Sequence, residues 1–287
     1  MSGPLRLATR GSALALAQAT LLADALRAVG VQVDQVVIRT TGDSLPEVPA
    51  AAMEGQGWFT TEIERALAED RADLAAHSAK DLPTQLGHGL EVAAYLPRGD
   101  ARDGVVGAPL RRLPGGARVG TSSVRREAML RGLRPDLAIV AMRGNVDTRL
   151  RKLDSGEVDA LVLACAGLDR LGLGERAAER LDPESFVPAP GQGAIAVEAR
   201  SGSEAADLAR RLDDAATRSA VTAERAVLAG VGGGCMLPLG VWARLEGDDL
   251  AVNAALLGAE ASRYASGRGD PADPLALAAT VVRMLTG

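Results

Sequence analysis

Short apolar runs alternate along this chain with longer segments of helical periodicity. Residues 5–9 form an apolar run, residues 13–28 place apolar side chains at helical spacing, and residues 31–38 are rich in β-branched side chains. Ser12, directly before the helical segment, is a candidate N-cap. These patterns predict a β-α-β unit at the start of the chain.

The alternation continues beyond a Pro- and Gly-rich loop at residues 42–57. The Thr61-x-x-Glu64 spacing that follows predicts a capping box at the start of a helix. Further strands are predicted at residues 72–76, 90–96, near 105, 117–120, 137–142 and 160–164, with helices after residues 123, 145 and 166. Parallel strands that alternate with helices form doubly wound sheets, so the predicted fold class is α/β.

Two turn-rich segments, residues 97–104 and 186–193, interrupt this pattern. We expect the chain to cross between two lobes at both, which would form a hinge with the ligand between the lobes. Residues 239–245 and 250–257 then predict a hairpin, and residues 274–285 a last helix, in a small α+β domain. The predicted division is domain 1 at residues 1–97 and 194–214, domain 2 at 98–193, and domain 3 at 215–287.

The composition narrows the class of protein. The chain has 287 residues and a net charge of -5, and only Lys80 and Lys152 are lysines, so 30 of its 32 basic residues are arginines. Two cysteines are too few for a disulfide framework, and none is spaced from a histidine as in a zinc site. We find no signal-peptide pattern and no run near the roughly 20 apolar residues of a membrane span. We therefore expect a cytoplasmic protein without a metal, a membrane or a nucleic acid as partner.

Arginines stand beside hydroxyls and glycines where predicted strands end. The segments are Arg10-Gly11-Ser12, Gly120-Thr121-Ser122-Ser123-Val124-Arg125-Arg126, and Arg143-Gly144-Asn145 with Arg149. An arginine fork binds a carboxylate or a phosphate bidentately, and the N–H groups of a helix start add anion donors. In an acidic chain, these turns predict a small anionic ligand. No Walker-type loop is present, and the glycines at 191–196 precede a strand-like run instead of a helix, which argues against a dinucleotide site. Carboxylate and phosphate both remain open.

Two further positions carry chemistry, each with a simpler alternative. Lys80-Asp81 follows a predicted strand end, where a carboxylate can stabilise positive charge on a substrate or transfer a proton. A solvated ion pair at a turn explains the same residues. Cys235 follows three glycines, which let a large group approach the thiol, although a small buried residue at a strand start is the alternative. Cys165, inside an apolar run, is expected to be buried.

Taken in order, six segments resemble the porphobilinogen deaminase family, also called hydroxymethylbilane synthases. They are Leu7-Ala8-Thr9-Arg10-Gly11-Ser12, His77-Ser78-Ala79-Lys80-Asp81-Leu82-Pro83, Gly120 to Arg126, Arg143-Gly144-Asn145-Val146, Pro190-Gly191-Gln192-Gly193 and Gly233-Gly234-Cys235. The resemblance spans nearly the whole chain. It implies two doubly wound lobes like those of periplasmic binding proteins, and a small α+β C-terminal domain that carries the cysteine. It also implies a monomeric transferase of tetrapyrrole (porphyrin and heme) biosynthesis, which joins four porphobilinogen molecules head to tail, with loss of ammonia, into hydroxymethylbilane.

The resemblance also implies a role for each matching residue. Cys235 would carry a dipyrromethane cofactor through a thioether, and Asp81 would be the catalytic carboxylate that steadies the cation left when ammonia departs. The other cofactor-binding positions would be Lys80, Ser78, Thr121, Ser123, Arg125, Arg126, Arg143 and Gly144. The substrate-binding positions would be Arg10, Ser12, Arg149, Arg170, Gln192 and Phe59. Each pyrrole bears an acetate and a propionate, which accounts for the number of arginines.

Three positions depart from the family's pattern. Gln56 stands where relatives commonly carry lysine, Gly232 replaces an acid before Gly-Gly-Cys, and Asp147 replaces a smaller neutral residue among the arginines. Two other functions fit the same anion-binding turns, namely a non-catalytic two-lobed binding module and a phosphate-handling transferase. The lack of a secretory signal or helix-turn-helix segment and the predicted thiol-bearing domain disfavour the first, and the missing phosphate loop disfavours the second.

Overall fold

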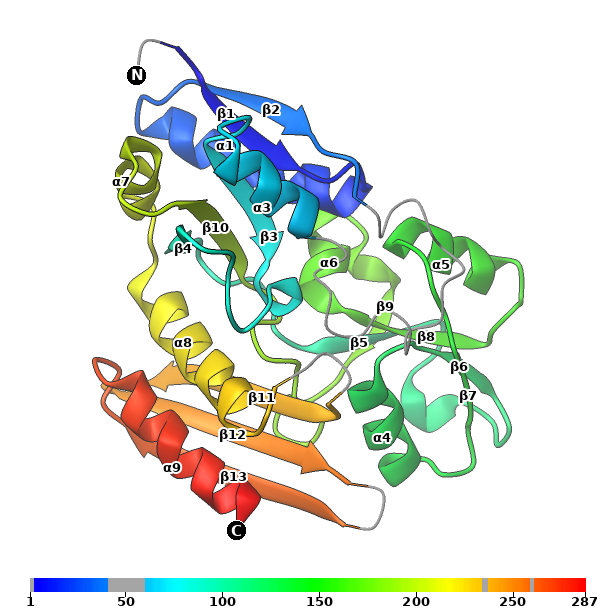
Figure 1. The fold of residues 1–287 in the computed structure, drawn as a ribbon. Coiled ribbons are helices and arrows are strands. Elements are labelled where there is room, and N and C mark those ends of the chain that lie inside the picture. Colours follow the sequence, from blue (N-terminus) through cyan, green and yellow to red (C-terminus); the bar gives the residue numbers. More distant parts are fainter. Residues whose placement is uncertain (1–2, 41–59, 234–236, 259–260) are drawn as a thin grey trace. The chain divides into compact units, whose positions relative to one another are not determined.

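The computed structural model describes residues 3–40, 60–233, 237–258 and 261–287 (Figure 1). The chain forms two compact units, one of residues 1–99 with 194–218 and the other of residues 100–193 with 219–287. The finer division into three domains stays a prediction. No helix in the described part is long and apolar enough to cross a membrane.

The first unit is built on a five-stranded sheet with the order β2-β1-β3-β10-β4. Its strands are β1 (Leu5–Thr9), β2 (Val33–Val37), β3 (Leu74–Ser78), β4 (Leu90–Tyr95) and β10 (Ile195–Arg200). β1 runs parallel to β2 and β3, whereas β10 lies antiparallel between β3 and β4. The β-α-β unit predicted from the first residues is therefore confirmed.

Helices cover both faces of this sheet. They are α1 (Ala13–Ala28), α3 (Thr61–Ala68) and α7 (Glu204–Arg210). Buried side chains of α1 and α7 share one core with the sheet, and those of α3 form a second. Ser12 caps α1 as predicted, since its side chain accepts from the Ala15 N–H. The predicted capping box at Thr61 is wrong, because the helix already begins at Thr61 and Thr60 is its N-cap.

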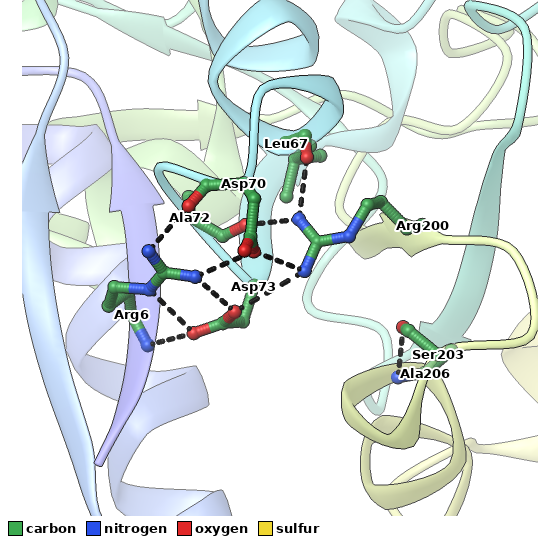
Figure 2. Close-up of polar contacts among 8 residues, drawn as sticks. All are labelled: Arg6, Leu67, Asp70, Ala72, Asp73, Arg200, Ser203 and Ala206. Carbon is green, nitrogen blue, oxygen red and sulfur yellow. Dashed lines mark hydrogen bonds and ion pairs between the residues drawn. The ribbon is translucent and has the colours of Figure 1, made fainter. Parts of the chain in front are cut away.

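An ion-pair network joins three segments where the parallel strands of this sheet begin (Figure 2). Arg6 of β1 donates to both carboxylate oxygens of Asp73, at 3.0 and 2.7 Å, and to Asp70 at 2.8 Å. Arg200, at the end of β10, lies 2.9 Å from the Asp70 carboxylate and donates to the carbonyls of Leu67 and Ala72. Asp70 has a φ of 56°, a conformation that aspartate tolerates better than most residues. The network thus fastens the α3–β3 turn to two strands.

The second unit contains a sheet of the same design, with the order β7-β6-β8-β5-β9. Its strands are β5 (Asp103–Val106), β6 (Arg118–Gly120), β7 (Ala138–Val140), β8 (Ala160–Ala164) and β9 (Ala177–Arg180). β6 is parallel to β7 and β8, and β5 is antiparallel to β8 and β9. The helices are α4 (Val124–Leu133), α5 (Val146–Asp154) and α6 (Cys165–Arg170), with α4 in one core and the other two in another. The α/β fold class is confirmed.

A smaller antiparallel sheet ends the chain. It consists of β11 (Leu239–Glu246), β12 (Asp249–Leu257) and β13 (Ser262–Gly269), and its core includes buried residues of α8 (Ala215–Gly230) and α9 (Pro274–Thr286). The predicted hairpin corresponds to β11 and β12. β13 was not predicted, since its sequence is small and polar. Gly240 of β11 lies against Val187, where a Cβ atom would stand 2.6 Å from the Val187 carbonyl oxygen. This sheet therefore packs closely on the segment that follows β9.

Candidate active site

In the first unit, two of the predicted segments emerge at the same edge of the sheet. β1 and β3 are parallel neighbours, with Ala8 opposite Ala75, so Arg10-Gly11-Ser12 and Ser78 to Asp81 follow neighbouring strand ends. The buried Gln18 of α1 donates from Nε2 to Ser78 Oγ at 2.9 Å and fixes that hydroxyl. Ser12 Oγ accepts the Ala15 N–H at 3.3 Å and keeps its own proton to donate. This edge has the donors that an anion requires.

Lys80 and Asp81 lie in a single 3₁₀ turn, Ala79–Asp81, directly after β3. Ala79 is buried and donates its N–H to the Ala194 carbonyl at 3.0 Å, which anchors the turn to the segment before β10. The Lys80 and Asp81 residues are exposed. A short anchored turn therefore presents a cation and a carboxylate side by side in sequence.

In the second unit, the loops after β6 and β7 form another such edge. Ser122 Oγ donates to the Met142 carbonyl at 2.7 Å and joins the two loops. Thr121 Oγ1 accepts the Ser123 N–H at 3.2 Å, and Ser123 Oγ accepts the Arg126 N–H at 3.4 Å as the N-cap of α4. The predicted hydroxyl residues thus shape the start of a helix, where N–H groups favour an anion.

Arg125 and Arg126 are buried beside a carboxylate that the sequence analysis did not single out. Asp103, at the start of β5, is fully buried, and its Oδ1 accepts from Arg126 Nε at 3.0 Å and Nη2 at 2.7 Å. Arg125 Nη2 lies 2.8 Å from the other oxygen, Oδ2. Burial alone would raise the pKa of Asp103, but the two guanidinium groups outweigh it and hold that pKa at about 2. One carboxylate shared by two cations leaves this group a net positive charge.

Arg143, Arg149 and Arg170 have different surroundings. Arg143 is half-buried, and Arg149 donates from Nε to the Gly144 carbonyl at 2.8 Å. Gly144 has a φ of 105°, and a Cβ atom there would lie 2.9 Å from Thr148 Cγ2, so the turn favours glycine. Arg170 Nη2 donates to the Gly193 carbonyl at 2.5 Å, and burial lowers the pKa of Arg170.

The comparisons with known proteins bear on the whole chain. Residues 5–207 match the family model described as "Porphobilinogen deaminase, dipyromethane cofactor binding domain", and residues 219–287 match "Porphobilinogen deaminase, C-terminal domain". The chain belongs to the porphobilinogen deaminase family. A porphobilinogen deaminase of Roseiflexus sp. (strain RS-1) is 49% identical over 285 residues, covering 96% of this chain and 94% of the relative. One of Stenotrophomonas maltophilia (strain R551-3) is 47% identical over 290 residues, covering 98% and 95%.

A solved structure with partial likeness is a periplasmic substrate-binding protein of an ABC transporter from Coxiella burnetii. It has a TM-score of 0.45 and 15% sequence identity, and the match covers 72% of this chain and 91% of that one. A likeness at this level carries no argument about function.

The described residues fit the polycarboxylate that the family's cofactor represents. Arg125 Nε is a buried donor without a hydrogen-bond partner among the residues that the structure describes, and a cationic N–H in that position requires an acceptor. In the described ranges, no group of three or more His, Cys, Asp or Glu residues is arranged to hold a metal ion.

Several predicted positions call for separate comment. Cys235, Phe59 and Gln56 lie outside the described residues. Gly232, one of the departures from the porphobilinogen deaminase pattern, has a φ of 89° just beyond α8, which favours glycine. Asp147, another departure, has its carboxylate 3.8 Å from the Arg151 guanidinium.

The sequence analysis missed three buried polar residues beside these segments, namely Gln18, Asp103 and Glu224. Asp103 stands in the turn-rich segment at residues 97–104, and Gln18 and Glu224 stand in segments of helical periodicity. Polar residues in such segments are normally exposed, so nothing in the sequence indicated that these three are buried.

Proposed function

We propose that this chain condenses four porphobilinogen molecules head to tail, with release of ammonia, into hydroxymethylbilane, and grows the product on a dipyrromethane bound to Cys235. The observation that carries this proposal is the set of arginines and hydroxyls at the ends of parallel strands in a porphobilinogen deaminase relative. Carboxylates match arginine forks in shape and charge. A lengthening chain of pyrroles brings two more carboxylates with each unit, so it requires many such donors.

The arginines divide into two groups by their exposure. Arg10 and Arg149 are not buried, so we assign them direct contact with the acetate and propionate groups of incoming units, whereas Arg143 stays in the proposed cofactor-binding set. Arg125 and Arg126 are buried around Asp103, so we assign them to the part of the ligand that stays in place, with Lys80, Ser78, Thr121, Ser123 and Gly144. The hydroxyls of Ser12, Thr121 and Ser123 already shape helix starts and still have protons to donate.

Asp81 is the residue that we assign to the chemical step. Its carboxylate is exposed on an anchored turn, next in sequence to Lys80. When the carbon–nitrogen bond of the aminomethyl group breaks and ammonia leaves, positive charge remains on the pyrrole. An ionised Asp81 can stabilise this charge and accept hydrogen bonds from pyrrole N–H groups. When bound, the dipyrromethane would supply the pyrrole carbon to which the next unit is joined.

The proposal extends to features that follow from the family. These are a three-domain organisation at the boundaries given above, a cytoplasmic location and a monomeric state. Arg170, Gln192 and Phe59 complete the proposed set that serves the substrate.

Intact-mass spectrometry of the purified protein tests the proposal directly. We expect an excess over the sequence mass equal to two linked pyrrole units, and hydroxymethylbilane formation when porphobilinogen is added. Cys235→Ser should lose the excess mass, whereas the matched control Cys165→Ser should keep it, because Cys165 is buried. A bare-chain mass in an active preparation would contradict the proposed attachment.

A further inference from the structure

Glu224 of α8 is a fully buried carboxylate that holds two backbone segments. Its Oε2 accepts the N–H of Gly191 at 2.6 Å, and its Oε1 accepts the N–H of Ala243 in β11 at 2.7 Å. Buried backbone N–H groups require acceptors. Each N–H meets its own oxygen, so a carboxylate accepts both, whereas a glutamine in the same position would turn its NH₂ group toward one of them.

The turn that Glu224 holds is itself fixed in an unusual conformation. Gly191 and Gly193 have φ values of 75° and 88°, a region that favours glycine. The N–H of Gln192, between them, donates to the Ala189 carbonyl at 3.0 Å. The backbone of this turn therefore has a single defined shape, and the Glu224 carboxylate fastens it to α8.

The same turn reaches two of the arginines assigned to ligand binding. Gln192 Nε2 donates to Asp103 Oδ1 at 2.9 Å and to the Ala101 carbonyl at 2.8 Å, and its Oε1 accepts from Arg126 Nη2 at 3.4 Å. The Gly193 carbonyl accepts from Arg170. Gln192 is 0% exposed, so its amide is committed to groups within the protein.

We propose that Glu224 and Gln192 are positioning residues, which act through the turn at 190–193. They hold Arg126 in place for the carboxylates of the bound cofactor and Arg170 for those of the substrate. Gln192 then acts through Arg126 and Asp103 instead of touching the substrate. The relay begins on α8, whose last residue, Gly230, stands five positions before Cys235. This inference rests on the proposed function, because it takes the two arginines as carboxylate-binding groups.

The effect of Glu224→Gln should fall mainly on KM. The amide leaves one of the two N–H groups facing another donor, so the turn loses its defined position while Asp81 is untouched. Misplaced carboxylate-binding groups weaken ground-state and transition-state binding alike, which raises KM more than it lowers kcat. We expect kcat/KM for porphobilinogen to fall more than tenfold.

The matched control is Ser219→Ala on the same helix. Ser219 is also buried, and its hydroxyl donates to the Pro271 carbonyl at 2.6 Å, away from the turn. It should lose a comparable buried hydrogen bond and a comparable amount of thermal stability, yet keep KM within twofold of the wild type. A KM for Glu224→Gln that is equally unchanged would overturn the inference.

A double-mutant cycle separates a relay from two independent structural defects. If Glu224 acts through Gln192, Gln192→Ala combined with Glu224→Gln should cost little more in kcat/KM than the worse single variant. Losses that simply multiply would refute the coupling.

Amide hydrogen exchange provides a readout that needs no activity. Glu224→Gln should speed exchange of the amides of residues 191–193, and Ser219→Ala should not; equal exchange in both would reject the positioning role. If the wild-type protein does not consume porphobilinogen, the proposed function fails, but the exchange result still decides whether Glu224 holds the turn.

Discussion

Replacing Asp103 with asparagine tests whether one buried carboxylate holds the arginine pair together. The change keeps the size of the side chain and removes its charge. Arg125 and Arg126 then remain buried, at 3% and 6% exposure, without their shared counterion. Removing one partner of a buried ion pair costs about 3–5 kcal/mol, because the remaining charge stays desolvated. We expect Asp103→Asn to destabilise the protein by an amount in this range.

The thermal shift follows from the size of the chain. Unfolding entropies of about 2 cal/mol/K per residue give about 0.6 kcal/mol/K for 287 residues. A loss of about 3–5 kcal/mol therefore lowers Tm by about 5–8 °C. Melting should be followed by circular dichroism or calorimetry at pH 7.

The acid dependence provides a second signature. The pKa of Asp103 is lowered from 3.8 to about 2 by Arg125 and Arg126, against the effect of burial. A lowered carboxyl pKa stabilises the fold above the unfolded pKa, and this stabilisation is lost as the pH falls through the folded pKa. For Asp103 it amounts to about 2 kcal/mol, lost between about pH 4 and pH 2. The stability difference between wild type and Asp103→Asn should therefore shrink by this amount over that interval.

Asp159→Asn is the matched control. Asp159 pairs with Arg118 beside the same sheet, but both side chains are more than 40% exposed. Its Tm should stay near that of the wild type, because exposed pairs contribute little. The reasoning about the buried carboxylate is wrong if Asp103→Asn has the same Tm as this control. It is also wrong if the stability difference between Asp103→Asn and the wild type is the same at pH 4 and pH 2.

Three further predictions concern single side chains. Asp81→Ala should keep the wild-type Tm, because the residue is exposed, and lose about 10²–10³ in turnover of porphobilinogen; near-normal turnover would end its assigned role. Burial raises the pKa of the Cys165 thiol to about 12, so this thiol should not react in the native protein. In a protein that carries the cofactor on Cys235, a thiol reagent should therefore label no cysteine before denaturation and one cysteine after it. Two labelled cysteines after denaturation would show that Cys235 is unmodified. Burial and the nearby Glu198 raise the pKa of Glu64, so ionisation of Glu64 opposes folding as the pH rises. The free energy of unfolding of Glu64→Gln, measured in urea, should therefore increase relative to that of the wild type between pH 4 and pH 8. A difference between the two proteins that does not change with pH would contradict this.

Local pattern was sufficient for elements whose periodicity is strong. β1, α1 and the β11–β12 hairpin were predicted from apolar spacing and a capping serine. β9 and β13 were missed, since Ala177–Arg180 resembles a helical sequence and Ser262–Gly269 is small and polar. Both become strands through pairing, β9 with β5 and β13 with β12. Pairing of distant segments overrides such weak local preferences.

The candidate site divides in the same way. Arg10 and Asp81 could be located because side chains that follow parallel strands gather at one sheet edge. Asp103 and Glu224 could not, because a charged residue in a polar or helical segment is normally solvated. Only the tertiary structure brings two arginines onto Asp103 and two backbone N–H groups onto Glu224.

The position of β10 has a consequence for the order of folding during synthesis. Among the described strands, β4 pairs only with β10, and β3 needs β10 on one side, yet β10 is made about a hundred residues after β4. At ribosomal rates of roughly 5–20 residues per second, the edges of β3 and β4 stay unpaired for roughly 5–20 s until β10 has been synthesised. The second five-stranded sheet, by contrast, has all its strands between residues 103 and 180 and can close during this interval. The sheet that is begun first is therefore completed after the second five-stranded sheet, and a nascent chain that stops before Arg200 exposes strand edges open to aggregation.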